Sequence, residues 1–354
     1  MTRSVDRDLP GPVGLPTRGR KAAVAEMTPE RFAELAAAVE AQIRRIIVGQ
    51  TVLVRDVLAC LFAEGHVLLE GVPGLGKTVL LRTLGEALSL EFTRVQCTPD
   101  LMPADIVGTN VIGEAGGGVR FAEGPMFTQL LLADEINRAT PKTQSALLEA
   151  MAERRVTVGG VTRDLPRPFF VMATQNPIEM EGTYPLPEAQ LDRFLAKVIV
   201  PLPSAEDLVE ILTRTTGSAV VTVDRVATTD DLLGAARLIR DVPIASHVVR
   251  YVVDLVEATH PVSPTAPDVV RRYVTHGASP RGAQSLVLLA KVYALLDGRL
   301  HASVDDVRGA AYTCLRHRLV LGYEAMPAGV TADDAVAAVL AQVGAPKPPV
   351  RGAV

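Results

Sequence analysis

The fold of this chain is decided by one stretch, Gly71-Val72-Pro73-Gly74-Leu75-Gly76-Lys77-Thr78, which fits the pattern G-x-x-x-x-G-K-[ST]. The apolar run before it, residues 66–70, predicts a short buried strand, and residues 79–84 after it predict a helix. Between a strand and a helix, glycines let successive backbone N–H groups point at phosphate oxygens, and the helix N-terminus adds positive potential. The stretch therefore predicts a phosphate-binding loop rather than a glycine turn beside a surface lysine.

Each residue type in this loop has an expected role toward a nucleotide. Lys77 would reach the β- and γ-phosphates, and the hydroxyl of Thr78 would ligate Mg²⁺. The backbone of the loop and of the first helical turn would surround the phosphates. The residues expected to contact the nucleotide here are Gly71, Val72, Pro73, Gly74, Leu75, Gly76, Lys77, Thr78 and Val79.

Composition limits the class of protein. The 36 basic and 40 acidic residues give a formal net charge of −4, so no global attraction toward nucleic acid follows. The three cysteines are far apart and odd in number, which fits buried or free thiols in a reducing cytoplasm and indicates no metal site. No apolar run approaches the length of a membrane span, and the polar N-terminus lacks the apolar core of a signal peptide. We therefore expect a cytoplasmic protein without membrane insertion.

Periodicity divides the chain into four parts. Residues 1–26 mix charged, proline and glycine residues without a pattern, and predict a disordered leader. Residues 27–203 predict an α/β nucleotide-binding domain, which begins with a helix capped by Thr28 and ends at a Pro-Leu-Pro sequence. Residues 204–344 show helical patterns and predict an all-α domain, and residues 345–354 predict a proline-rich, disordered tail.

Two adjacent carboxylates follow the apolar strand predicted for residues 127–133. They are Asp134 and Glu135, and they lie where open α/β sheets bind their ligands. Asp134 can hold Mg²⁺ directly or through water, while Glu135 can orient and polarise the water that attacks the γ-phosphate. An acidic pair at a strand end is often only a solvated cap, but a phosphate loop about 60 residues upstream favours the catalytic interpretation.

Asn176 and Arg193 are further candidates for catalysis. Asn176 follows the buried strand predicted for residues 169–174 and could lie between the γ-phosphate and the water held by Glu135; the alternative is an ordinary turn residue before Pro177. Arg193 could bring a guanidinium to the γ-phosphate of a neighbouring subunit. Considered alone, an arginine at this position would more often form a surface ion pair.

Gly49 and Arg281 are candidates for nucleotide contacts outside the loop. Gly49 follows the first helix and could be its C-cap or part of an adenine pocket. Arg281 lies in the first turn of a predicted helix, where the helix dipole disfavours a cation by roughly 0.3–1 kcal/mol. A bound phosphate would reverse that cost, so we favour a nucleotide-sensing role over a surface arginine.

Two hairpins are predicted to project from the α/β domain. Strand-like residues 107–112 and 119–121 flank a glycine-rich segment, for which a flexible surface loop is the alternative. Residues 155–163 alternate on both sides of Gly159-Gly160, which is a strong signal for a two-residue hairpin.

Together these elements resemble AAA+ ATPases and, more narrowly, the MoxR family. The resemblance covers residues 47–323, most of the chain. Besides the phosphate loop, it is carried by Ala133-Asp134-Glu135-Ile136-Asn137-Arg138, Ala173-Thr174-Gln175-Asn176-Pro177, the long run from Gly182 to Phe194, and Gly277-Ala278-Ser279-Pro280-Arg281.

The resemblance implies a P-loop AAA+ core with a five-stranded parallel sheet between helices, a helical lid, and a ring, commonly a hexamer, with ATP at the subunit interfaces. By position, Asn176 is similar to the first sensor of the family, Arg193 to its trans-acting arginine finger, and Arg281 to its second sensor. The hairpins resemble those of the helix-2-insert group, which includes magnesium chelatase subunits and MCM helicases. Because the lid is displaced in that group, Arg281 could serve its own or a neighbouring subunit, and Arg138 competes for the finger role.

The resemblance also implies a function, a chaperone-like ATPase that remodels or matures partner proteins. The expected partner is a von Willebrand factor A domain protein, and insertion of metal ions or cofactors is one such task. A nucleic-acid motor is the rival, supported by Arg154, Arg155 and Arg163 around the second hairpin. The balanced charge, the lack of tryptophan and the few aromatic residues oppose it. A scaffold timed by nucleotide hydrolysis is a third possibility.

Overall fold

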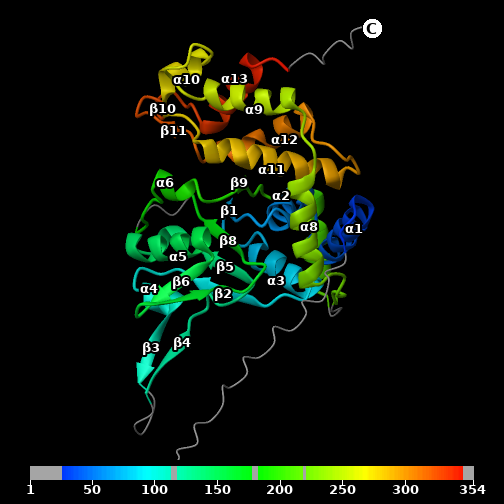
Figure 1. The fold of residues 1–354 in the computed structure, drawn as a ribbon, viewed down its shortest axis with the longest axis vertical. Coiled ribbons are helices and arrows are strands. Elements are labelled where there is room, and N and C mark those ends of the chain that lie inside the picture. The colour runs from blue at the N-terminus through cyan, green and yellow to red at the C-terminus, as the bar shows by residue number, and fades with distance from the viewer. Residues whose placement is uncertain (1–25, 113–117, 178–181, 218–220, 346–354) are drawn as a thin grey trace, which may run out of the picture.

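The computed structural model describes residues 26–112, 118–177, 182–217 and 221–345. The predicted leader and tail therefore lie outside the described residues, except for Glu26 and Ala345, and so does most of the glycine-rich segment of the first hairpin. Within the described part, a sheet flanked by helices lies below a body of helices formed by the C-terminal third of the chain (Figure 1).

Five parallel strands form the central sheet, which confirms the predicted fold class. Their order is β2–β5–β8–β1–β9. Neighbouring strands end in register, since Gln96 lies opposite Asp134 and Glu70 lies opposite Gln175. Their carboxyl ends therefore meet at one edge of the sheet. The strands are β1 (Val67–Glu70), β2 (Phe92–Gln96), β5 (Leu130–Asp134), β8 (Phe170–Gln175) and β9 (Ala196–Ile199).

Alternate strand residues bury two separate cores, one on each face of the sheet. Leu69 and Leu132 belong to the core shared with the first three helices, while Leu68 and Leu131 belong to the core shared with α5. All four side chains are fully buried, as expected for strands covered on both faces. The helices of this part are α1 (Pro29–Ile46), α2 (Thr51–Phe62), α3 (Lys77–Leu88), α4 (Pro103–Val107), α5 (Pro141–Glu153) and α6 (Glu188–Leu191), with a 3₁₀ turn, η2 (Ile136–Arg138).

Both predicted hairpins are present and project from the sheet on the side of β2 (Figure 1). Strand β3 (Gly108–Ile112) pairs with β4 (Val119–Glu123), and β6 (Arg155–Val158) pairs with β7 (Val161–Asp164). The two hairpins are braced against each other, because the Arg163 guanidinium lies 3.9 Å from the centre of the Phe121 ring.

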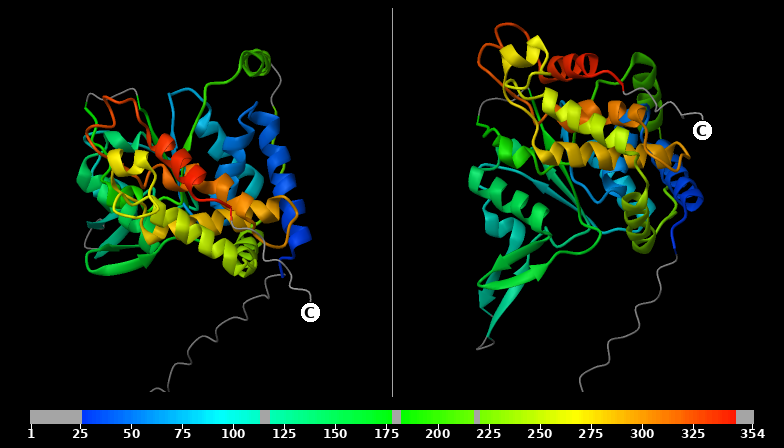
Figure 2. Two further views of the ribbon diagram at one scale, coloured as in Figure 1. Left: turned by 90° about the horizontal axis from the view of Figure 1, so that it is seen from above. Right: turned by 45° about the horizontal axis from the view of Figure 1, so that its top comes forward.

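The C-terminal part is helical, as predicted, with one addition. A short antiparallel pair, β10 (Val274–His276) and β11 (Val320–Leu321), was not predicted and closes one end of the helical body. Helix α7 (Ala205–Thr215) stands apart from the rest (Figure 2). The remaining helices are α8 (Thr229–Asp241), α9 (Ser246–Ala258), α10 (Asp268–Tyr273), α11 (Pro280–Leu296), α12 (Val304–Leu315) and α13 (Ala332–Gln342).

The three cysteines are in the state that their spacing predicts. Cys60, Cys97 and Cys314 are buried free thiols, and burial raises the pKa of Cys97 and of Cys314 to about 12. Among the helices that the structure describes, none combines the length and the apolar character needed to cross a bilayer.

Candidate functional site

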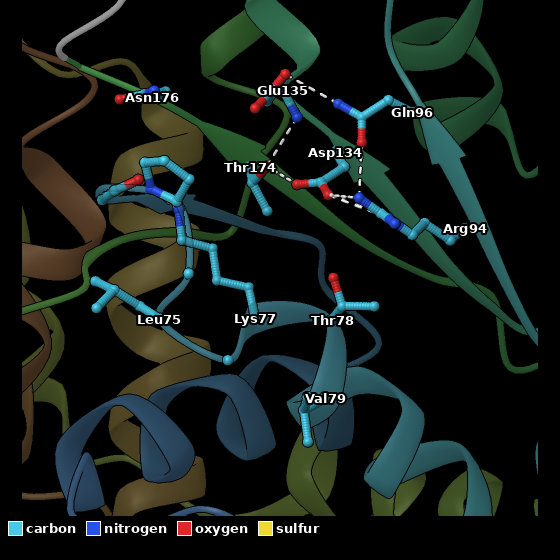
Figure 3. Close-up of a pocket in the computed structure, with 14 residues that line it drawn as sticks. Leu75, Lys77, Thr78, Val79, Arg94, Gln96, Asp134, Glu135, Thr174 and Asn176 are labelled. Atoms are coloured by element: carbon cyan, nitrogen blue, oxygen red, sulfur yellow. Dashed lines mark hydrogen bonds and ion pairs between the residues drawn. The ribbon is translucent and has the colours of Figure 1, made fainter. Parts of the chain in front are cut away.

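A pocket of about 360 Å³ lies over the carboxyl ends of β1, β5 and β8 (Figure 3). The loop between β1 and α3 forms one wall, and polar side chains from the strand ends form the other. Val72 is not among the lining residues that the described part of the chain supplies. The pocket is lined by Gly71, Pro73, Gly74, Leu75, Gly76, Lys77, Thr78, Val79, Arg94, Gln96, Asp134, Glu135, Thr174 and Asn176.

The loop conformation depends on its glycines. Gly74 and Gly76 have φ angles of +83° and +78°, in the left-handed region that favours glycine. Gly71 has no room for a side chain, since a Cβ there would lie 2.9 Å from the Cβ of Val200. Gly76 is the N-cap of α3, so the helix begins at Lys77 with its unpaired N–H groups at the pocket. This arrangement suits an anionic ligand.

The side chain of Lys77 lies inside the loop that would bind the phosphates. Its Nζ donates a hydrogen bond to the carbonyl oxygen of Gly71. Burial lowers the pKa of Lys77, while the carboxylates of Asp134, Glu135 and Glu70 act in the opposite direction. The ammonium group therefore lies between the loop backbone and the acidic wall of the pocket.

The two carboxylates are oriented by different partners. Asp134 accepts a hydrogen bond from Thr174 Oγ1 at 2.6 Å and forms an ion pair with Arg94 at 2.7 Å. Glu135 accepts from Gln96 Nε2 at 2.9 Å and from Arg138 Nη1 at 3.1 Å. Figure 3 shows the Glu135 side chain turned toward Gln96.

Glu135 has a backbone conformation that is uncommon for a residue with a side chain. Its φ angle is +55°, in the left-handed region, and its N–H donates to Thr174 Oγ1 at 2.8 Å. The same threonine hydroxyl thus binds Asp134 and fixes the backbone of Glu135. Such local strain is often found at functional sites.

Three further residues orient the carboxylates and were not predicted from the sequence as site residues: Arg94, Gln96 and Thr174. Arg94 and Gln96 come from β2, and they reach the carboxylates because β2 lies beside β5 with Gln96 opposite Asp134. The alternation of the predicted strand over residues 92–97 placed Arg94 and Gln96 on one face, but only the strand order shows which neighbour they meet.

Asn176 directly follows β8. It is buried at the end of β8 and lines the pocket together with Lys77 and Glu135. A side-chain amide at this point can hydrogen-bond both phosphate oxygen and water.

Replacing Thr174 by Val is expected to impair the site without changing its shape. The substitution removes the hydroxyl that binds Asp134 Oδ1 and the N–H of Glu135, so both half-buried groups lose a partner, although Asp134 keeps its ion pair with Arg94. The cost is about 1–3 kcal/mol in the free energy of unfolding. ATP turnover should fall by about tenfold or more, because both carboxylates lose their orientation. Urea unfolding and steady-state ATPase assays would measure the two effects. Thr93→Val in β2 is the matched control, and an equal loss in both variants would contradict the assignment.

Arg193 and Arg281 lie elsewhere. As far as the described residues define the pocket, neither lines it; both line a separate hollow of about 290 Å³ between the segment after α6 and the start of α11. The Nη1 of Arg193 donates to the carbonyl oxygen of Leu148 at 2.7 Å. Arg281 is exposed in the first turn of α11. Arg138, the competing finger candidate, is paired with Glu135 of its own chain.

Gly49 is not the C-cap of the first helix. Helix α1 ends at Ile46 with Ile47 as its C-cap, and Gly49 follows with a φ angle of +63°. A Cβ at Gly49 would lie 2.6 Å from the carboxylate of Asp207, so a side chain there would collide with the start of α7. The next residue, Gln50, donates to the carbonyl oxygen of Leu75 at 3.4 Å, which places this turn beside the phosphate loop.

The donor set suits Mg²⁺ bound together with a nucleotide. The Thr78 hydroxyl and the Asp134 carboxylate offer hard oxygen ligands in one pocket. In the part of the chain that the structure describes, no group of three or more His, Cys, Asp or Glu residues could form a metal site alone. Mg²⁺ in such sites is typically held by one or two protein ligands with phosphate oxygens and water.

Comparison with known proteins agrees with this geometry. Residues 66–196 match the model of the "ATPase family associated with various cellular activities (AAA)", and residues 268–339 match that of the AAA lid domain. Chaperone MoxR1 of Mycobacterium tuberculosis is 43% identical over 306 residues, which cover 86% of this chain and 81% of that protein. Protein MoxR of Methylorubrum extorquens is 33% identical over 336 residues, which cover 88% of this chain and 96% of that protein.

A solved structure extends the agreement to three dimensions. The crystal structure of a candidate ATPase from Cytophaga hutchinsonii is 36% identical and has a TM-score of 0.85, covering 90% of this chain and 97% of that chain. The predicted fold class and the predicted family are both confirmed. On its sequence, its fold and its lid, this chain belongs to the MoxR family of AAA+ ATPases.

Proposed function

We propose that this protein binds ATP with Mg²⁺, hydrolyses it in an oligomeric ring, and uses the cycle to remodel or mature partner proteins. The observation that carries the proposal is the pocket in which Lys77, Thr78, Asp134, Glu135 and Asn176 meet at the carboxyl edge of the sheet. Phosphoryl transfer depends almost entirely on positioning and charge stabilisation, and this pocket supplies both.

Each residue has a distinct task in hydrolysis. The loop backbone and Lys77 bind the β- and γ-phosphates, while Glu135 and Asn176 orient the attacking water between them. Thr78 and Asp134 would hold Mg²⁺, which neutralises charge on the phosphate oxygens. Gln96 and Arg138 both donate hydrogen bonds to Oε2 of Glu135. Oε1 is therefore the oxygen that would accept a hydrogen bond from the attacking water.

A ring, which we expect to be a hexamer, places a second subunit at the pocket. Because Arg193 and Arg281 line a hollow separate from the pocket of their own chain, contact with a γ-phosphate is most simply made to the nucleotide of a neighbour. Arg193 would then act as a finger in trans. For Arg281 the same separation favours the trans arrangement over the cis one, and Gly49 would lie near the adenine.

One relative supports the remodelling role. Chaperone MoxR1 is described as a chaperone, which supports a remodelling role for this chain in the cytoplasm. A von Willebrand factor A domain protein is the expected partner, and insertion of metal ions or cofactors into it or into a client is one form that maturation could take. The nucleotide-timed scaffold would show the same ATPase without remodelling.

The nucleic-acid motor loses support, because the three arginines that favoured it have protein partners. Arg154 is paired with Glu64 at 3.2 Å, Arg155 is paired with Glu153 at 3.1 Å, and Arg163 stacks on an aromatic ring of the other hairpin. Each of these arginines therefore has a partner within the protein, and only Arg163 joins the two hairpins.

A capture experiment tests the proposal. Protein carrying Glu135→Gln, mixed with native cytoplasm in excess ATP and Mg²⁺, should hold its clients in the ATP-bound state. Recovery of a von Willebrand factor A domain protein, lost with Lys77→Ala, would support the proposal. Recovery chiefly of nuclease-sensitive nucleic acid would contradict it and favour the motor.

A further inference from the structure

A buried arginine of the lid binds the segment that carries Arg193. Arg318 follows α12, and its side chain is 2% exposed. Its Nε donates to Asp192 Oδ1 at 2.7 Å, and its Nη2 donates to the carbonyl oxygen of Phe194 at 2.6 Å. Arg318 therefore binds the residues on both sides of Arg193.

The other oxygen of the Asp192 carboxylate is bound by a second lid element. Ser279 Oγ donates to Asp192 Oδ2 at 2.8 Å and accepts from the N–H of Arg281 at 3.1 Å. Ser279 is the N-cap of α11. Asp192 thus joins two parts of the lid, the segment after α12 and the start of α11. Its partner at the start of α11, Ser279, is two residues before Arg281.

The geometry of Arg318 leaves little freedom at this junction. Its Nη2 also donates to Ser285 Oγ at 3.0 Å, and its Nη1 donates to the carbonyl oxygens of Leu195 and Cys314. A planar guanidinium offers its donors in fixed directions, so these bonds set the orientation of the lid against residues 192–195. A lysine at this position would keep the positive charge but would lose the fixed directions of these hydrogen bonds.

Few hydrogen bonds hold the side chain of Arg193 in place when this backbone moves. Besides the bond to Leu148, its Nε is buried without a hydrogen-bond partner among the described residues. Its placement is therefore set mainly by where residues 192–194 are held. Because Ser279 and Arg318 belong to one packed helical body, a lid movement carries them together and displaces Asp192.

We propose that Asp192 and Arg318 are positioning residues through which the lid of one subunit places Arg193, and thereby sets the hydrolysis rate at the neighbouring subunit's nucleotide. This inference rests on the proposed trans role of Arg193. A misplacement of about 1 Å in a catalytic group can lower a rate by about 10²-fold, so a small lid rotation suffices.

Two variants test the inference directly. Asp192→Asn keeps the shape of the side chain but removes its negative charge. Arg318→Lys keeps the positive charge but removes the planar guanidinium and its fixed donor directions. Each is expected to lower kcat by about tenfold or more, with KM for ATP changed by less than about twofold, because each subunit's own pocket is intact. Arg316→Lys is the matched control, since Arg316 makes a two-bond ion pair with Asp333 inside the lid. An equal loss of kcat in this control would overturn the inference.

Mixed rings separate positioning from a purely structural role. Arg318→Lys subunits retain a competent pocket, and Glu135→Gln subunits retain a well-placed Arg193, so the mixture is expected to exceed the activity of either protein alone several-fold. Asp192→Asn should complement in the same way. If neither variant complements while Arg193→Ala does, the inference is overturned and the trans role stands. If Arg193→Ala itself fails to complement, the trans role is contradicted, and the inference falls with it.

Discussion

Protein carrying Glu135→Gln is expected to bind ATP as the parent protein does and to hydrolyse it about 10²–10⁴-fold more slowly, the range typical of a lost general base. The glutamine retains an oxygen that can accept from Gln96, and it has the same length, so the pocket keeps its shape. What is lost is the negative charge that polarises the water. Steady-state ATPase assays and equilibrium binding of a fluorescent ATP analogue measure the two properties separately.

Two further variants are compared with Glu135→Gln, one that should not bind ATP and one that should behave as the parent protein does. Lys77→Ala should fail at binding, because it removes the ammonium group between the loop and the acidic wall. Glu91→Gln is the matched control, since Glu91 is an exposed carboxylate that directly precedes β2, at the opposite edge of the sheet from the pocket. Turnover by Glu135→Gln at the rate of this control would refute the assignment of Glu135 as the base.

Local sequence patterns were sufficient for most of the fold. The first helix was predicted to be capped by Thr28, and α1 does begin at Pro29 with the Thr28 hydroxyl accepting a hydrogen bond from the N–H of Arg31. Both hairpins were predicted from alternation around glycines. The short helix α4 was missed, since its five residues lie in a proline-rich stretch that resembles a turn. The pair β10–β11 was missed because two or three residues carry no measurable period.

The candidate site was predicted where a motif is contiguous and missed where contacts are long-range. The phosphate loop and the acidic pair are local, so their residues were identified together. Gln96 and Thr174 come from the two strands that flank β5, and strand order is a property of the whole sheet. The Asp192–Arg318 pair spans 126 residues and joins two parts of the fold, so no local pattern indicates it.

A second large effect is expected on the pH dependence of stability, and it begins with a buried histidine. His66 lies in the segment between α2 and β1, where its Nε2 contacts the carbonyl oxygen of Met151 at 3.1 Å and its Nδ1 accepts from the N–H of Val171 at 3.0 Å. This pattern requires a neutral ring, with the proton on Nε2. Burial lowers the pKa of His66 to about 4, opposed by the hydrogen bond to Met151.

The sign of the effect follows from which state binds the proton. Between pH 6.5 and about pH 4 the unfolded chain protonates this histidine and the folded chain does not, so the free energy of unfolding falls as the pH falls. From pH 7 to pH 5 the loss due to His66 is about 2 kcal/mol, and at still lower pH it approaches about 3 kcal/mol. His317 adds a loss of the same sign, since burial lowers its pKa well below the usual range.

Urea unfolding at pH 7 and pH 5 measures this loss. His66→Gln is expected to reduce stability at pH 7 but to remove about 2 kcal/mol of the difference between the two pH values, because glutamine does not titrate. His247→Gln, on the exposed surface of α9, is the matched control and should leave the difference unchanged. An equal pH dependence in the parent and in His66→Gln would show that His66 is not neutral in the fold. The two hydrogen bonds that orient it between α5 and β8 would then have to be reassigned, because a protonated ring cannot accept from Val171.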